Sequence, residues 1–122
     1  MKTLLLWLCT CLCLVSCKKE DVTEGVSIRI RNASTYSLEN ITVKTPGGQN
    51  SYGTVASGQA SDYQVFSKAY SYAYVNVTVQ GQELLIQPID YVGERPLAAG
   101  RYTYVLDIVA DTPNRLTLRL DR

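Results

Sequence analysis

The chain has 122 residues, which is enough for one domain with its own core and too short for two. It contains no histidine, which excludes a Ser-His-Asp triad and any histidine-ligated metal site. Its twelve basic and eleven acidic side chains leave a formal charge of +1, a near-neutral balance that gives no electrostatic footprint for nucleic acid. Its four cysteines all stand between positions 9 and 17, so no disulfide framework can form in the rest of the chain.

The first 16 residues predict a secretory signal peptide. Lys2 supplies a short basic region, an apolar run extends from Leu4 to Val15, and the small residue Ser16 follows it. This run is shorter than the about 20 apolar residues that a spanning helix needs. Charged residues begin immediately afterwards at Lys18, which argues against a buried helix. We therefore expect residues 1–16 to be removed on export.

Leu14-Val15-Ser16-Cys17 resembles the lipobox of bacterial lipoproteins and stands at the end of the apolar run. The resemblance implies a diacylglycerol thioether on Cys17, cleavage before this residue and acylation of its new amino group, as with palmitate. Each buried CH₂ group contributes about 0.8 kcal/mol, and two or more chains give stable anchoring. We therefore expect lipid on Cys17 to hold the protein on a membrane without a spanning helix.

Residues 17–25 are expected to form a flexible lipidated tether. Lys18 is not the aspartate of the inner-membrane retention signal found in enteric lipoproteins, so the expected location is the outer membrane. Lys19-Glu20-Asp21 resembles the export tag, a lysine with two acids, of surface lipoproteins in some Gram-negative phyla. That resemblance implies exposure at the cell surface, and a solvated charged tether is the alternative interpretation.

After the tether, apolar and polar residues alternate at period two, and no helical period is sustained. The alternation predicts strands over 26–31, 38–44, 73–80, 84–86, 101–108 and 115–120, a loop or short edge strand over 49–57, and a short strand over 62–66. A bulge is expected near Glu39-Asn40, because Leu38 is out of phase with Ile41. Gln80-Gly81 predicts a tight hairpin, and Thr112-Pro113-Asn114 predicts a type I turn.

Seven or eight such strands, each with one apolar face, predict an all-β fold over residues 26–122. Two antiparallel sheets would pack as a sandwich to bury those faces. Leu97-Ala98-Ala99-Gly100-Arg101-Tyr102 resembles the tyrosine corner of immunoglobulin-like and transthyretin-like sandwiches. The resemblance implies that the Tyr102 hydroxyl bonds a backbone group a few residues upstream. The cysteine pair and the core tryptophan of antibody domains are absent.

Tyrosines are the candidate binding residues. Tyr70, Tyr72 and Tyr74 alternate with residues that continue into the valine-rich strand, so three rings would line the outer face of a sheet. Such a ladder could stack on sugar rings or dock a protein, and packing across neighbouring strands is the alternative. Tyr91, in the loop over residues 88–96, is a second candidate for this surface.

Basic side chains form a second pattern. Arg29, Arg31, Arg115 and Arg119 would make a basic stripe if the first and last strands shared a sheet, and a solvated face interleaved with acids is the alternative.

The expected function is a non-enzymatic binding or envelope-assembly module with no catalytic residue, cofactor or metal site. The expected partners are the membrane, through Cys17, and an unidentified protein or glycan, with no role for nucleic acid. An inhibitor or immunity-like protein, which blocks an enzyme through the loop over 88–96, is the alternative. A hydrolase is the third hypothesis, with the carboxylate pairs Asp90 with Glu94 and Asp107 with Asp111 as its candidates.

Overall fold

The computed structural model describes residues 25–89, 91 and 93–122, which form eight β-strands and no helix. The strands are β1 (Val26–Asn32), β2 (Leu38–Thr45), β3 (Gly48–Val55), β4 (Gln64–Phe66), β5 (Tyr74–Val79), β6 (Gln82–Ile86), β7 (Gly100–Val109) and β8 (Arg115–Asp121). This part of the chain accordingly offers no helix that could cross a membrane. The expected signal peptide and the lipidated Cys17 lie outside the described residues.

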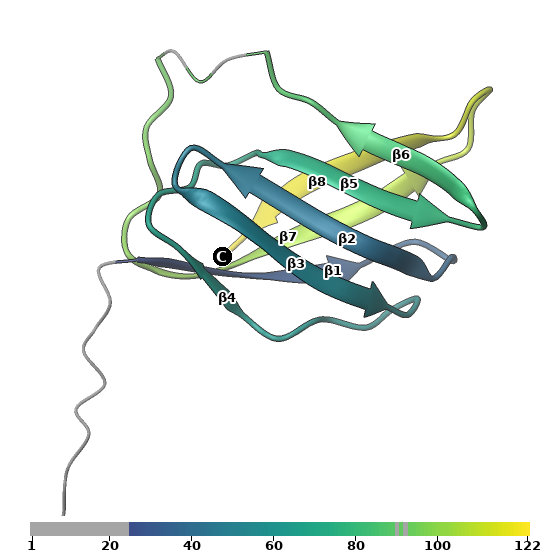
Figure 1. Ribbon diagram of the computed structural model, residues 1–122, viewed down its shortest axis with the longest axis horizontal. Helices are drawn as coiled ribbons and strands as arrows, with labels where there is room; N and C mark the ends of the chain where they lie inside the picture. The colour runs from purple at the N-terminus through teal and green to yellow at the C-terminus, as the bar shows by residue number, and fades with distance from the viewer. Residues whose placement is uncertain (1–24, 90, 92) are drawn as a thin grey trace, which may run out of the picture.

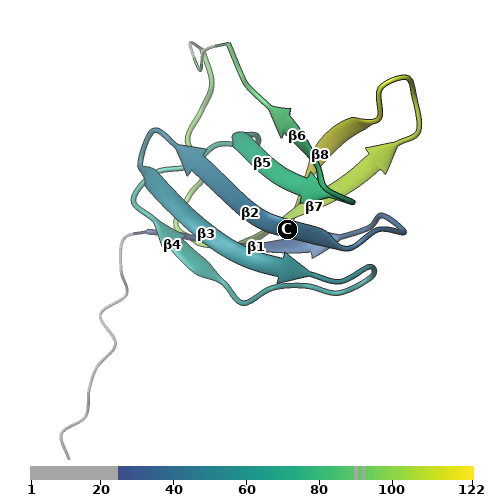
Figure 2. The same ribbon diagram turned by 45° about the vertical axis from the view of Figure 1, so that its right-hand side comes forward.

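The strands form two four-stranded sheets that pack face to face (Figure 1). Sheet A has the strand order β4-β1-β7-β8, and sheet B has the order β3-β2-β5-β6. A view turned by 45° shows sheet B lying in front of sheet A (Figure 2). The two layers follow from the alternation in the sequence, because each sheet has one apolar face that only another sheet can cover.

One strand pair departs from the expected antiparallel arrangement. β1 runs parallel to β7, from Val26 opposite Gly100 to Asn32 opposite Leu106, and the other strand pairs of the described chain are antiparallel. All of sheet B and β4 lie between these two strands in the sequence, which provides the long connection that a parallel pair requires. Alternation of side chains is the same in both strand directions, so the sequence pattern does not reveal this pairing.

The core lies between the two sheets and takes alternate residues from their strands. Its largest fully buried apolar side chains are Tyr104, Phe66, Ile28, Ile30, Leu38, Ile41, Leu106, Val43, Val75 and Val77. Burying one large apolar side chain stabilises a protein by about 1.5–3 kcal/mol. Because residues 25–122 contain no cysteine, this apolar layer supplies the main stabilisation of the domain.

The turns that bound β2, β5 and β6 follow the sequence closely. A register shift between Leu38 and Ile41, with a φ of 48° at Asn40, confirms the expected bulge in β2. Gln80 and Gly81 have φ values of 50° and 79° and join β5 to β6. Positive φ at both central residues is what a type I′ hairpin requires.

Two strands differ in extent from the expectation. The segment expected as a loop or short edge strand is the complete eight-residue edge strand β3, and β4 is confined to three residues. Edge position explains the weak pattern of β3, because polar residues are tolerated there on both faces. The expected turn at Thr112-Pro113-Asn114 joins β7 to β8, and its Thr112-Pro113 peptide bond is cis.

The expected tyrosine-corner hydrogen bond is confirmed. The Tyr102 hydroxyl donates to the backbone oxygen of Ala98 at 2.8 Å. Gly100, between the two, has a φ of 152°, a conformation that residues with a Cβ atom rarely adopt. The bond fixes the entry of the chain into β7.

Asn32 ends β1 with a fully buried amide whose hydrogen-bonding capacity is filled. Its Nδ2 donates to the backbone oxygens of Tyr36 at 2.6 Å and Val55 at 2.9 Å. Its Oδ1 accepts from the backbone nitrogen of Ser34 at 2.9 Å and from the Ser34 hydroxyl at 2.7 Å. One side chain therefore ties the end of β1 in sheet A to the end of β3 in sheet B.

Candidate functional site

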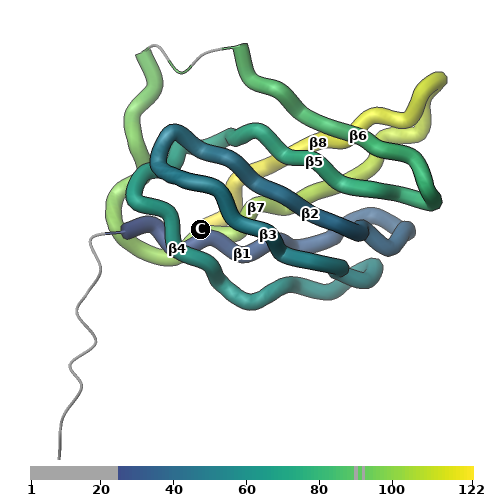
Figure 3. Tube along the Cα trace, viewed as in Figure 1, coloured from purple at the N-terminus to yellow at the C-terminus, as the bar shows by residue number. Residues whose placement is uncertain are grey.

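Three connections gather at one end of the sandwich: the β2–β3 turn, the segment 67–73 between β4 and β5, and the segment 87–99 between β6 and β7 (Figure 3). The chain also enters β1 at this end, after Gly25. Four of the nine tyrosines lie in or next to these connections, namely Tyr70, Tyr72, Tyr74 and Tyr91. This end therefore holds all the tyrosines that the sequence marked as binding candidates.

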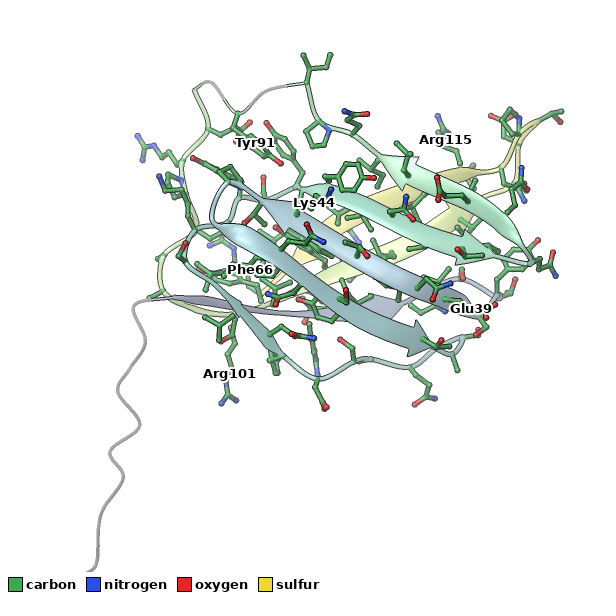
Figure 4. All side chains as sticks on the ribbon, in the orientation of Figure 1. Glu39, Lys44, Phe66, Tyr91, Arg101 and Arg115 are labelled. Atoms are coloured by element: carbon green, nitrogen blue, oxygen red, sulfur yellow. The ribbon has the colours of Figure 1, made fainter. Side chains whose placement is uncertain are left out.

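Tyr91 stacks on two tyrosines of the neighbouring connection (Figure 4). Its ring centroid lies 4.8 Å from that of Tyr70, with the planes inclined by 24°, and 5.2 Å from that of Tyr72, with the planes inclined by 10°. Such aromatic pairs contribute about 0.5–1.5 kcal/mol each beyond the area that they bury. The stack fastens the long β6–β7 connection to the β4–β5 connection. We call Tyr70, Tyr72, Tyr74 and Tyr91 the tyrosine cluster.

Backbone hydrogen bonds hold the cluster on the sheets. The fully buried Tyr104 hydroxyl donates to the backbone oxygen of Tyr70 at 2.6 Å. The backbone nitrogen of Leu97 donates to the backbone oxygen of Ala69 at 2.8 Å, which joins the two connections directly. The segment that carries Tyr70 is thus joined to the core through Tyr104 and to the β6–β7 connection through Leu97.

The β2–β3 turn packs closely on the same segment. The Ser67 hydroxyl donates to the backbone oxygen of Gly47 at 2.8 Å, and the Thr45 hydroxyl donates to that of Lys68 at 2.7 Å. A Cβ atom at Gly47 would lie 2.2 Å from the Lys68 nitrogen, a distance that no real Cβ contact reaches. Glycine at this position therefore permits the close approach of the turn to the segment 67–73.

Burial raises the pKa of one tyrosine hydroxyl in the cluster and of two others in the domain. Desolvation raises the pKa of Tyr91, the nearby Tyr70 raises it slightly further, and a hydrogen bond from the backbone of Tyr74 opposes the shift. Burial also raises the pKa of Tyr104 and of Tyr52, whose hydroxyl donates to the Ile28 backbone oxygen at 2.7 Å. These groups are therefore neutral at physiological pH, and the site offers hydroxyl groups rather than negative charge.

The expected three-ring ladder is not formed. β5 begins at Tyr74, so Tyr70 and Tyr72 precede the strand instead of alternating along it. Tyr70 is only 9 % exposed, as the most buried ring of the stack, and the fully buried Ala69 next to it breaks the alternation. The segment 67–73 instead crosses from β4 in sheet A to β5 in sheet B. Burial of two consecutive side chains there replaces the strand pattern.

Tyr74 lies on the outer face of sheet B, as expected for one ring of the ladder. It is half-buried, and the Lys44 ammonium lies 5.0 Å from its ring centroid. Its hydroxyl accepts a hydrogen bond from Asn76 Nδ2 at 3.4 Å. Tyr72 and Tyr91 are also half-buried, so these three rings, with Tyr70 under them, form the accessible part of the cluster.

Among the described residues of the loop over 88–96, one apolar side chain is almost fully exposed. Ile89 is 98 % exposed, while Tyr91 two residues later is held by the stack. The backbone nitrogen of Glu94 donates to the Tyr91 backbone oxygen at 3.0 Å and closes a turn. The expected partner of Glu94, Asp90, lies outside the described residues.

Each acid of the second carboxylate pair accepts a hydrogen bond from the backbone nitrogen of the next residue. Asp107 Oδ1 accepts from the backbone nitrogen of Ile108 at 2.7 Å, and Asp111 Oδ1 accepts from that of Thr112 at 2.9 Å. Both carboxylates are exposed at the end of β7. Within the described part of the chain, no three residues of the metal-binding types histidine, cysteine, aspartate and glutamate come together.

No protein-family model matches the chain, and no curated protein is recognisably similar to it. Its fold is similar to that of a protein from Eubacterium rectale whose structure was solved by NMR. The TM-score is 0.59 at 16 % sequence identity, over 81 % of this chain and 92 % of the other. At that identity the similarity concerns the fold alone, a small all-β domain of two packed sheets.

Proposed function

We propose that the protein is a membrane-anchored lipoprotein whose β-sandwich is a non-enzymatic binding module. The lipobox-like Leu14-Val15-Ser16-Cys17 supports the anchor, and residues 17–25 would join it to β1. Lys19-Glu20-Asp21 supports a place on the outer membrane with the domain exposed at the cell surface.

The sandwich is proposed to be of the transthyretin-like type rather than the immunoglobulin-like type. In an immunoglobulin constant domain, the first two strands belong to the same sheet. In this protein β1 belongs to sheet A and β2 belongs to sheet B. The hydrogen bond from Tyr102 to Ala98 fits both types, so the sheet assignment of the first two strands is what supports the transthyretin-like type.

The ring stack of Tyr70, Tyr91 and Tyr72 is the observation that carries the binding proposal. Tyrosine combines a flat apolar ring with a polar tip, which suits stacking on a sugar ring or on an apolar protein side chain. The backbone bonds beneath the cluster fix the rings before a ligand arrives. Little side-chain entropy is then lost on binding, which favours affinity.

Tyrosine fluorescence can test the binding proposal directly. The one tryptophan, Trp7, belongs to the expected signal peptide, so tyrosines alone emit in the mature protein. Soluble gluco-, xylo- and chito-oligosaccharides and a peptide library are the probes. We expect Tyr72→Ala and Tyr91→Ala to weaken binding about fivefold or more. Leu85→Ala, an exposed apolar residue on β6, is the control and should bind like the parent. Equal binding by all three variants, or no binding of any probe, would contradict the proposal.

Metabolic labelling with an alkynyl fatty acid tests the anchor. The full chain should incorporate the label and sediment with membranes. Cys17→Ser should lose both properties, whereas Cys13→Ser, within the expected signal peptide, should retain them. A Cys17→Ser protein that stays unprocessed and membrane-bound would indicate a signal anchor instead.

The exposed Ile89 favours inhibition of an enzyme as the second candidate function. An exposed apolar side chain on a loop that the ring stack holds two residues later could enter the active site of a hydrolase. The probes are lysozyme and trypsin-like proteases, assayed with and without the protein. If inhibition is the function, Ile89→Asp abolishes it and leaves oligosaccharide binding unchanged.

A further inference from the structure

Arginines gather on the outer face of sheet A. Strand register places Arg29 opposite Thr103, Arg31 and Arg119 on either side of Val105, Arg101 opposite Ser27, and Arg115 opposite Val109. These five arginines, of seven in the chain, are called the arginine face. Arg101 and Arg115 lie at its two ends (Figure 4). β1 and β8 do share a sheet, which was the condition for the expected basic stripe, and β7 lies between them and adds Arg101.

Contacts within the face position several of these side chains. Arg29 Nε donates to the Thr103 hydroxyl at 3.0 Å, and the guanidinium carbons of Arg29 and Arg101 each lie 5.3 Å from the Tyr63 ring centroid. Val105 points outward and yet is only 4 % exposed. Its register neighbours on the two adjoining strands are Arg31 and Arg119, and long arginine stems can cover apolar surface in this way. Two of the five arginines, Arg29 and Arg101, are therefore held by contacts to the same tyrosine ring.

The positive charge of this face is not balanced internally. Among the described residues, none of the five arginines forms an ion pair. Of the two acids on the face, Asp107 accepts a hydrogen bond from its neighbouring backbone nitrogen and Asp121 stands opposite Thr103. Arg31 and Arg119 are two strand spacings apart, about 10 Å. Like charges at such a distance repel each other, and an anionic partner would relieve that repulsion.

Apolar side chains at the margins of the same face identify the kind of anion. Tyr63, Val65 and Val109 are 39 %, 51 % and 38 % exposed, and register places Val65 opposite Ser27 and Val109 opposite Arg115. A soluble polyanion would neutralise the arginines and leave the valines in water. A lipid surface supplies anionic headgroups for the arginines and the edge of the acyl region for the valines.

We propose that the arginine face docks on an anionic lipid surface, so that sheet A lies on the membrane and sheet B faces away from it. The choice of a lipid over other polyanions rests in part on the proposed anchor. The eight residues from Cys17 to Glu24 span at most about 28 Å, which keeps the domain beside the membrane. The tyrosine cluster, at the end of the sandwich, stays accessible in this orientation.

The test uses the soluble domain, residues 25–122, which contains the whole core cluster and lacks Cys17. Cosedimentation is measured with phosphatidylcholine vesicles, with and without about 30 % phosphatidylglycerol, at low salt and at about 0.5 M salt. The parent domain should cosediment with the anionic vesicles at low salt and should no longer do so at high salt. Each arginine at an anionic surface contributes about fivefold in affinity, so R31Q/R119Q should bind about 25-fold more weakly.

The control K68Q/R95Q removes the same charge from outside sheet A and should stay within about twofold of the parent. Thermal unfolding checks that each variant is folded. If R31Q/R119Q does not fold, Arg115→Gln replaces it, with an expected loss of about fivefold in vesicle affinity. Absence of binding to anionic vesicles, equal losses in both double variants, or tighter binding to heparin or duplex DNA than to vesicles would overturn the proposal. Since the soluble domain lacks Cys17, the vesicle experiment tests the docking proposal alone. Failure of lipid labelling in the full chain would count against the anchor only.

Discussion

Replacing Asn32 with alanine should remove a large share of the stability of the domain. The substitution deletes two donors and one acceptor that serve the Tyr36 oxygen, the Val55 oxygen and the Ser34 nitrogen. A buried polar group left without a partner costs about 1–3 kcal/mol. With some access of water to the Tyr36 oxygen, we expect Asn32→Ala to lower the free energy of unfolding by about 3–5 kcal/mol. A domain of this size has about 5–15 kcal/mol in total.

Urea unfolding, followed by tyrosine fluorescence and by circular dichroism, measures this loss. Asn50→Ala is the matched control, because Asn50 Nδ2 also donates to a backbone oxygen, that of Val65 at 2.9 Å, but in an exposed place. The control should cost at most about 1 kcal/mol. If Asn32→Ala costs no more than the control, the amide does not tie the two sheets together and the reasoning fails.

Three further changes probe the support of the tyrosine cluster. Tyr104→Phe should lower the free energy of unfolding by about 1–3 kcal/mol, because it leaves a buried carbonyl without its donor. Tyr102→Phe removes an exposed hydrogen bond and should lower it by only about 0.5–1.5 kcal/mol. Urea unfolding measures both losses. Gly47→Ala should destabilise the domain by about 1–3 kcal/mol and weaken the ring stack, which would appear as reduced ring-current shifts in NMR spectra. Burial raises the pKa of Tyr52 and Tyr104, so the unfolded chain loses these protons first. Stability should be complete below about pH 10 and decline above it, with a shallower decline in Tyr104→Phe; an unchanged slope would contradict this.

Alternation of side chains was sufficient to predict most of the fold. The inward residues of β1, β5 and β7 stood in phase in the sequence, and positive φ at Gln80-Gly81 followed from turn chemistry. The parallel pairing of β1 with β7 was not predictable, because it depends on which edges meet after the chain has passed through sheet B. The buried role of Asn32 was missed for a similar reason, since its partners at Val55 and Tyr36 are set by tertiary contact.

The sequence named the four tyrosines of the cluster but did not predict how they come together. Tyr70, Tyr72, Tyr74 and Tyr91 do gather at one place, but through stacking between two connections rather than along one strand. Contact between segments some twenty residues apart leaves no periodic trace in the sequence. The position of Arg101 among the other outward arginines was also not predictable from the sequence, because it depends on β7 lying next to β1.

The central position of β1 has a mechanical consequence. The chain that precedes Gly25 runs directly into a strand that has β4 on one side and β7 on the other. A force applied through that chain along the strand axis would have to slide β1 past seven paired residues of β7 and three of β4 simultaneously. An edge strand would instead open one pair at a time. The domain is therefore built to resist traction from its N-terminal side far better than a peeling force on β8, its other terminal strand.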